Sequence, residues 1–173
     1  MNVSINMSDS QQEKLHNLHS KWSLYSHLPH DTDWTIKSYQ KITDFDSVEK
    51  VISVTKLIPE KTVQNCMLFI MRNNIKPMWE DTDNRKGGCF SFKVTNAIVS
   101  SVWERLTYTL VGETLFNGDK NANVNGITIS PKKNFCIIKV WTKDCSNQNP
   151  FDMNLFDGLT SNGCLFKKHA PEF

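Results

Sequence analysis

The chain has 173 residues, of which 39% are hydrophobic and 22% are charged, and its formal net charge is +2. This length predicts a single domain with a sizeable core. The net charge is too small to indicate bulk electrostatic binding of nucleic acid, so any anion site must be local. The sequence has no signal-peptide pattern and no apolar run of the roughly 20 residues that a membrane span needs. We therefore expect a monomeric protein with reduced cysteines and no membrane partner, in the cytoplasm with a nuclear fraction left open.

The amino-terminal part predicts a tail followed by a strand. Residues 1–15 are polar and are expected to form a flexible tail, and residues 16–173 to form the single domain. Between residues 21 and 26 apolar and polar side chains alternate, which is typical of a half-buried strand. Residues 28–33 form a polar loop from whose tip Trp34 emerges, and residues 35–43 have an extended pattern.

The middle of the chain predicts two helices and two strands. Residues 44–58 have a helical pattern that is capped near Asp46 or Ser47 and stopped by Pro59. Apolar strands are expected over residues 66–72 and 88–94. Asn96 is the expected N-cap of the second helix, in which apolar residues recur at helical spacing as far as Gly112.

The last third predicts a hairpin and two weaker elements. A loop over 117–126 leads to strands 126–130 and 135–142, which flank a turn at 131–134. A helix around 150–159 and a strand over 163–168 follow. Many short strands with two or three helices predict an α+β fold, in which helices cover one face of a mostly antiparallel sheet.

The strand at 135–142 distinguishes the two faces of that sheet. Cys136, Ile138 and Val140 point one way and are uniformly apolar, so they should lie under the helices. The opposite set mixes Lys139 and Trp141 with apolar residues. A face that carries both kinds of side chain is partly hydrated and suits a ligand.

The sequence offers little for catalysis or metal binding. It contains no GxSxG, HExxH or P-loop motif. Four histidines fall between His16 and His30, but no cysteine or carboxylate pattern completes a tetrahedral zinc set, and we interpret them as surface-loop residues. We predict a non-enzymatic protein without a metal or cofactor.

The five tryptophans are the unusual feature of this composition. Trp22 and Trp103 lie within patterned elements and are expected to be structural. Trp34 and Trp79 neighbour polar loop residues, and two facing indoles would sandwich a flat cationic ring. Glu80 supplies acceptor oxygens that match the N1–H and N2–H₂ donors of guanine.

Phosphate binding completes the predicted ligand. Three lysines on or beside the strand of Trp141 can hold phosphates, namely Lys132, Lys133 and Lys139. The other acidic residues next to Trp79 are interpreted as contributing loop solubility. A site of this kind would read a positively charged guanine that bears phosphates, as in the 7-methylguanosine cap of mRNA.

With these residues identified, the sequence resembles the eukaryotic translation initiation factor 4E family from about His16 to Phe173. The strongest marker is PMWEDTDNRKGG (77–88), and SKWSLY, FDSVE, KVWTKDC and KKHA agree in order. The resemblance implies a curved, mostly antiparallel sheet of about eight strands, with about three helices on its convex face and the cap in its concave face. It implies that Trp34 and Trp79 stack on the base. It also implies that the Glu80 carboxylate reads guanine and that Trp141 lies beside the N7 methyl group.

The phosphate positions depart from the family pattern. Lys132 stands where the family has an arginine, so the charge is kept and the bidentate fork is lost. Ile137 stands in place of a lysine, for which Lys139 or Lys133 can substitute, and Cys89 stands where a basic residue is common. We expect an intact base pocket and an altered phosphate grip.

The partner surface departs further. The family binds scaffold factor 4G and repressor proteins through a dorsal surface centred on a tryptophan, which is Ile52 here. Two leucines of that surface become Glu104 and Tyr108, and three residues fit the pattern: Val48, Val111 and Gly112. The resemblance thus leaves two roles open. The protein is either an initiation factor or a divergent member that acts as a repressor or competitor or with altered partners. A viral or parasite origin is one option for such a divergent member. The apolar stripe of Val48 and Ile52 is either the remnant of a partner site or the edge of the core.

Overall fold

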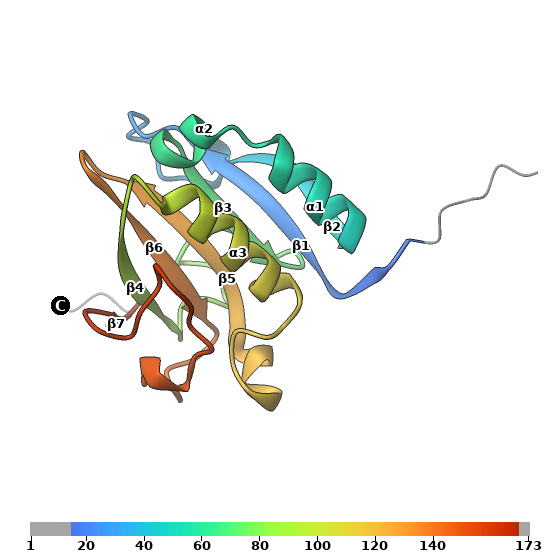
Figure 1. The fold of residues 1–173 in the computed structure, drawn as a ribbon, viewed down its shortest axis with the longest axis vertical. Helices are drawn as coiled ribbons and strands as arrows, with labels where there is room; N and C mark the ends of the chain where they lie inside the picture. Colours follow the sequence, from blue (N-terminus) through green and yellow to red (C-terminus); the bar gives the residue numbers. More distant parts are fainter. Residues whose placement is uncertain (1–14, 170–173) are drawn as a thin grey trace, which may run out of the picture.

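The computed structural model describes residues 15–169, so the tail expected at 1–15 lies outside the described residues except for its last position. Within them seven strands form one sheet in the order β2-β1-β3-β5-β6-β4-β7, and every neighbouring pair is antiparallel (Figure 1). The strands are β1 (Asn17–His27), β2 (Gln40–Ser47), β3 (Met67–Arg72), β4 (Gly88–Thr95), β5 (Val124–Pro131), β6 (Phe135–Thr142) and β7 (Leu165–Lys168).

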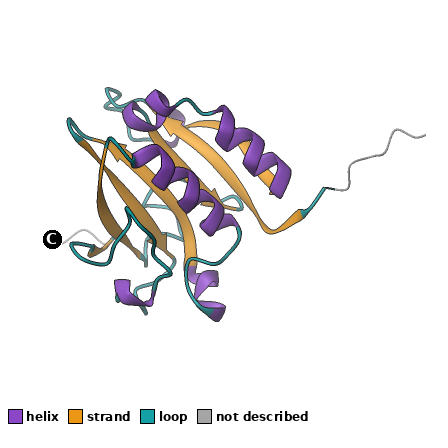
Figure 2. Ribbon diagram, viewed as in Figure 1, coloured by secondary structure: helices purple, strands orange, loops and turns teal. Residues whose placement is uncertain are grey.

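Three α-helices of the described residues lie on one face of this sheet (Figure 2). They are α1 (Val48–Leu57), α2 (Glu60–Asn65) and α3 (Val99–Val111). The predicted α+β fold, a curved antiparallel sheet backed by helices, is confirmed. None of these helices is long and apolar enough to cross a membrane.

The main core fills the space between the sheet and the helices. Cys136, Ile138 and Val140 of β6 are fully buried there, as their alternation predicts. Trp22 and Trp103 are also fully buried in this core, which confirms their structural role. Since their burial removes large apolar rings from water, each contributes roughly 2–3 kcal/mol or more to stability.

A smaller apolar cluster lies on the other face of the sheet. It consists of Phe69, Met71, Cys89 and Trp141, and Tyr25 and Tyr39 pack against it. Residues that alternate with the main core along β3, β4 and β6 therefore make a second, partly covered surface. This surface is the floor of the site described below.

The boundaries of several elements differ from prediction. The segment 44–47 continues β2, and the first helix begins only at Val48, because Ser47 is its N-cap and its hydroxyl accepts a hydrogen bond from the Lys50 N–H at 3.4 Å. The sequence does not predict α2, because Pro59 indicates the end of the preceding helix; in the structure Pro59 is also the N-cap of α2. The predicted helix at 150–159 is wrong: only the 3₁₀ turn η3 (Pro150–Asp152) forms there.

Two smaller expectations also fail. The N-cap of α3 is Ile98, and the side chain of Asn96 instead accepts a weak hydrogen bond from the Cys136 thiol at 3.7 Å. The loop at 117–126 contains a 3₁₀ helix, η2 (Gly118–Asn123), and the first residues of β5. The predicted cap at Asn96 is therefore wrong, and the 3₁₀ helix within the loop was not predicted.

Candidate functional site

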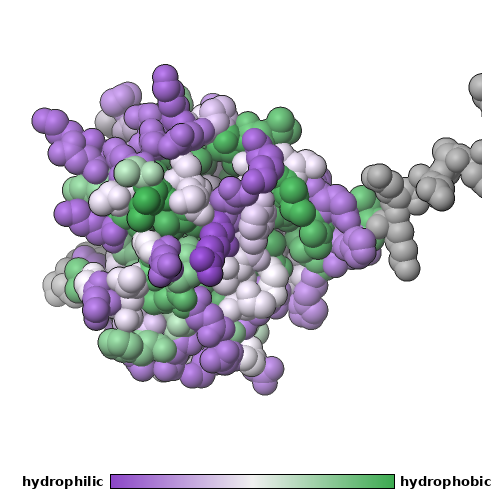
Figure 3. All heavy atoms as spheres, in the orientation of Figure 1, coloured by the Kyte–Doolittle hydropathy of each residue, from purple (hydrophilic) through white to green (hydrophobic). Residues whose placement is uncertain are grey.

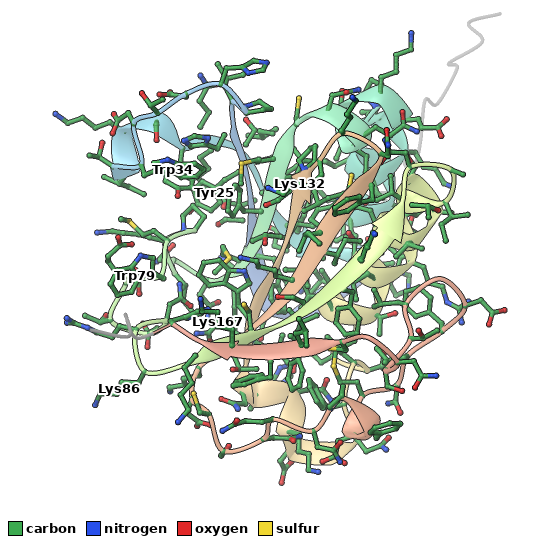
Figure 4. The ribbon with its side chains drawn as sticks, turned by 90° about the vertical axis from the view of Figure 1, so that its left-hand side faces the viewer. Tyr25, Trp34, Trp79, Lys86, Lys132 and Lys167 are labelled. Atoms are coloured by element: carbon green, nitrogen blue, oxygen red, sulfur yellow. The ribbon has the colours of Figure 1, made fainter. Side chains whose placement is uncertain are left out.

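A cleft of about 280 Å³ opens on the face of the sheet away from the helices. The structure brings five of the predicted ligand residues to its walls and floor: Trp34, Trp79, Glu80, Lys139 and Trp141. Trp34 and Trp79 lie on separate loops at the same end of the molecule (Figure 4). Residues that sequence reasoning did not single out complete the lining, namely Tyr39, Met67, Phe69, Pro77, Met78, Thr128 and Ser130.

Trp34 is held by the end of β1. Its ring stacks on the imidazole of His27 with centroids 4.3 Å apart and planes within 5°, yet the residue remains 52% exposed. His27 is itself buried, and its Nε2–H donates to the Asp33 carbonyl at 2.9 Å. The expectation that His27 is a surface-loop residue is therefore wrong: its buried ring supports one face of the Trp34 indole.

Trp79 lies on the loop of residues 76–87, which is organised by Asn84. The Asn84 side chain is fully buried and its Nδ2 donates to the carbonyls of Lys76 and Met78 at 3.0 and 2.9 Å. The Asp81 carboxylate accepts from the Lys76 N–H at 3.1 Å, so it shapes the loop and does more than add solubility. Because these bonds fix the backbone on both sides of Trp79, its ring can stay 40% exposed without the loop collapsing.

The floor of the cleft is formed by Trp141. Its Nε1–H donates to the Thr128 hydroxyl at 3.2 Å, which fixes the ring against the sheet. The imidazole of His169 packs on the indole at 4.6 Å, and its Nδ1 donates to the Asn84 carbonyl at 2.9 Å. Burial lowers the pKa of His169, and the nearby Lys139 charge lowers it further, so the ring is neutral at physiological pH.

Glu80 and Tyr39 set the electrostatics of one wall. Burial raises the pKa of the Tyr39 phenol to about 12, and the neighbouring Glu80 carboxylate adds to this shift. Tyr39 therefore stays a neutral hydroxyl at all physiological pH values. Glu80 is exposed and forms no ion pair with any residue between 15 and 169, so its acceptor oxygens are available to a ligand.

The predicted phosphate lysines separate into two groups. Lys139 lines the cleft from β6. Lys132 and Lys133 are exposed on the turn between β5 and β6, which is closed by a hydrogen bond from the Lys132 N–H to the Phe135 carbonyl at 2.8 Å, and they do not line the cleft. No group of three or more His, Cys, Asp or Glu side chains that could hold a metal ion occurs among residues 15–169.

A second hollow, which we term the dorsal groove, lies between α1 and α3 and has a volume of about 380 Å³. All six residues predicted for a partner surface line it: Val48, Ile52, Glu104, Tyr108, Val111 and Gly112. Ile52 is 45% exposed, so it is not part of the core. Figure 3 looks onto the helices and shows hydrophobic residues exposed beside α1.

The polar end of the dorsal groove is an internal network. Glu104 pairs with Lys56 at 2.6 Å and accepts a hydrogen bond from the Tyr108 hydroxyl at 2.9 Å. The hydrogen bonds from Lys56 and Tyr108 lower the pKa of Glu104, which remains ionised. The charge that replaces an apolar side chain in this groove is thus neutralised within the chain.

An antiparallel sheet that carries helices on one face and a cleft walled by exposed indoles and a free carboxylate on the other defines an α+β ligand-binding domain. Comparison with known proteins gives the family. The family described as "Eukaryotic initiation factor 4E" matches residues 17–159, and the chain belongs to this family.

Relatives and solved structures agree with this assignment. The eukaryotic translation initiation factor 4E of Candida glabrata is 30% identical over 150 residues, covering 82% of this chain and 70% of the relative, and that of Saccharomyces cerevisiae is 30% identical over 145 residues, covering 79% and 67%. The structure of Ascaris suum eIF4E-3 with m7G cap superposes with a TM-score of 0.70 at 22% identity, covering 80% and 79% of the two chains. A Schistosome eIF4E complexed with m7GpppG and 4E-BP gives a TM-score of 0.71 at 24% identity, covering 80% and 78%.

Proposed function

We propose that this protein binds the 7-methylguanosine cap of mRNA in translation initiation, and that it is a binding protein without enzymatic activity. The observation that carries the proposal is the cleft in which Trp34, Trp79 and the unpaired carboxylate of Glu80 meet. An indole face attracts a cationic ring through its quadrupole, and methylation at N7 makes guanine such a ring. The base would lie between the two exposed indoles.

The remaining residues of the cleft fit the same ligand. The Glu80 carboxylate can accept two hydrogen bonds from the guanine edge, and the methyl group would pack against Trp141 on the floor of the cleft. Lys139 supplies a positive charge beside the base, and Lys132 and Lys133 supply further charge at the turn beyond it. Solved family members are described as complexes with m7G and m7GpppG, which supports this assignment.

Binding of 7-methyl-GTP and of GTP, measured by quenching of tryptophan fluorescence, tests the proposal. We expect clear preference for the methylated nucleotide, because only that base carries the charge. Trp79→Ala should weaken 7-methyl-GTP binding at least about tenfold, since the loss of one stack removes ~1–3 kcal/mol. Phe151→Ala, which truncates an aromatic residue that is 73% exposed on η3 outside the cleft, serves as the control. Equal affinity for the two nucleotides would refute the proposal.

The dorsal groove favours a second role, that of a divergent member that engages an altered partner or acts as a repressor. Ile52 leaves the groove without an aromatic anchor, and the Lys56–Glu104 pair makes one end of it polar. A helical YxxxxL-type scaffold peptide would therefore lose a contact that is often worth about 2 kcal/mol or more. Tight binding of such a peptide would favour the initiation factor, and weak binding the divergent role.

A further inference from the structure

We infer that Lys167 of β7 is a phosphate-binding residue of the cleft and acts together with Lys139 of β6. This inference rests on the proposed cap-binding function and names a ligand contact that the sequence did not indicate. The phosphate chain would leave the base pocket across β6 and β4 toward β7, between the two lysines.

The strand register places Lys167 on the same face of the sheet as the cleft. Cys89 of β4 pairs with Trp141 of β6 on one side and with Lys167 of β7 on the other. Directly paired residues of antiparallel strands project from the same face. Lys167 therefore extends the row that begins at the floor of the cleft.

The neighbours of Lys167 confirm this direction. Phe166 packs into the main core with its ring 4.9 Å from that of Phe90, so it points to the helical face. Alternation along β7 then turns Lys167 toward the cleft and Lys168 away from it. Beyond β7, the His169 N–H donates to the Gly87 carbonyl at 3.0 Å, which holds this strand end against the loop of Trp79. Figure 4 shows Lys167 and Trp79 on the same side of the molecule.

The space between the two lysines can accept an anion. Lys139 pairs with Ser91 and Lys167 with Cys89, two residues apart on β4, so the short side chains of β4 form a low floor between the lysines. From the usual strand spacing, their Cα atoms lie about 12 Å apart, a span that two flexible lysine stems can close from either side.

The local charge favours the same ligand. β4, β6 and β7 contain four lysines and no carboxylate, although the whole chain carries a net charge of only +2. Neither Lys139 nor Lys167 forms an ion pair within residues 15–169, whereas Lys41, Lys56 and Lys120 are all paired. Two unpaired ammonium groups around a neutral floor suit a chain of phosphates.

The matched pair Lys167→Ala and Lys168→Ala tests the inference, because both remove one positive charge from adjacent exposed positions of β7. Binding of 7-methyl-GTP and of the 7-methylguanosine nucleoside would be measured over a range of salt concentrations. We expect Lys167→Ala to weaken 7-methyl-GTP binding about five- to tenfold and to make that binding less sensitive to salt, with nucleoside binding unchanged. Lys168→Ala should behave like the wild type.

A rescue variant distinguishes a lost contact from a general loss of charge. Adding Cys89→Lys to Lys167→Ala returns an ammonium group to the paired position and should restore part of the affinity and of the salt sensitivity. Equal effects of the two alanine variants, in a protein that still prefers 7-methyl-GTP to GTP, would overturn this inference alone. Absence of that preference in the wild type would overturn the cap-binding proposal itself.

Discussion

Asn84→Ala should destabilise the protein and weaken cap binding together, although Asn84 lies outside the cleft lining. Its buried side chain makes three hydrogen bonds: Nδ2 donates to the carbonyls of Lys76 and Met78, and Oδ1 accepts from the Asn125 Nδ2 at 3.0 Å. Each bond contributes roughly 1 kcal/mol net, and each buried partner left without one costs roughly 1–3 kcal/mol. Because water can enter the space and satisfy part of this loss, we expect the free energy of unfolding to fall by about 3 kcal/mol.

The effect on the ligand follows from the loop. Without Asn84 the backbone on both sides of Trp79 loses its anchors, and fixing each loose residue again on binding costs about 1–2 kcal/mol. We expect 7-methyl-GTP affinity to fall about tenfold or more, mainly through a faster dissociation rate. Urea denaturation gives the stability, and stopped-flow fluorescence gives the rates.

A double-mutant cycle with Asn125→Ala tests whether Asn84 acts through a hydrogen-bond network that it shares with Asn125. Asn125 also donates to the Asp83 carbonyl at 2.7 Å, so its loss and that of Asn84 affect one network. We expect the two changes in unfolding free energy to be non-additive by at least about 0.5 kcal/mol. Asn134→Ala, at an exposed turn position, is the control. Strict additivity, or a loss under about 1 kcal/mol with unchanged affinity, would refute the role given to Asn84.

Two further outcomes concern the helical side. Burial alone would raise the pKa of Glu113, but hydrogen bonds from Ser20 and Arg72 and the Arg72 charge lower it. Glu113 therefore contributes stability that is fully present above the unfolded pKa of about 4.3 and is lost as pH falls through the folded pKa. Glu113→Gln should therefore lower stability at pH 7 and flatten the acid limb of the stability curve measured by urea denaturation; an unchanged limb would contradict this. Ile52→Asp should weaken peptide binding in the dorsal groove at least about tenfold, because a charge at the centre of an apolar groove is costly to desolvate. The affinity for 7-methyl-GTP should stay unchanged. Calorimetry with the scaffold peptide and with 7-methyl-GTP measures both affinities.

The fold was predictable where one face of an element is buried. The alternation in β6 identified the residues under the helices, and Trp22 and Trp103 could be assigned to the core from their patterned surroundings. Boundaries failed where two elements join without a loop, as at Ser47, which ends β2 and caps α1. A hydrophobic pattern cannot locate such a junction, because the strand and the helix share one apolar surface.

The candidate site was predictable only in the side chains that would touch the ligand. Two indoles, a carboxylate and a lysine can be recognised by residue type and neighbours. The residues that position them cannot, because Asn84, His27 and His169 act through contacts between segments distant in sequence. An Asn in a charged loop resembles a solvated residue until its carbonyl partners are located in space.

The dorsal groove shows why a single substitution is a poor guide to a lost surface. Taken alone, Glu104 places a charge where an apolar contact is expected, and the cost of desolvating that charge would abolish the contact. In the structure that charge is paired with Lys56 and hydrogen-bonded to Tyr108, while Val48 and Ile52 remain exposed along the rest of the groove. These three polar residues form one connected network, so the groove has an apolar floor and a neutralised polar end. A partner of the groove must match both the apolar floor and the polar end. The groove and the cleft lie on opposite faces of the sheet, and the core beneath the groove shares no residue with the cluster beneath the cleft. A change of partner in the groove therefore does not require a change in the cleft.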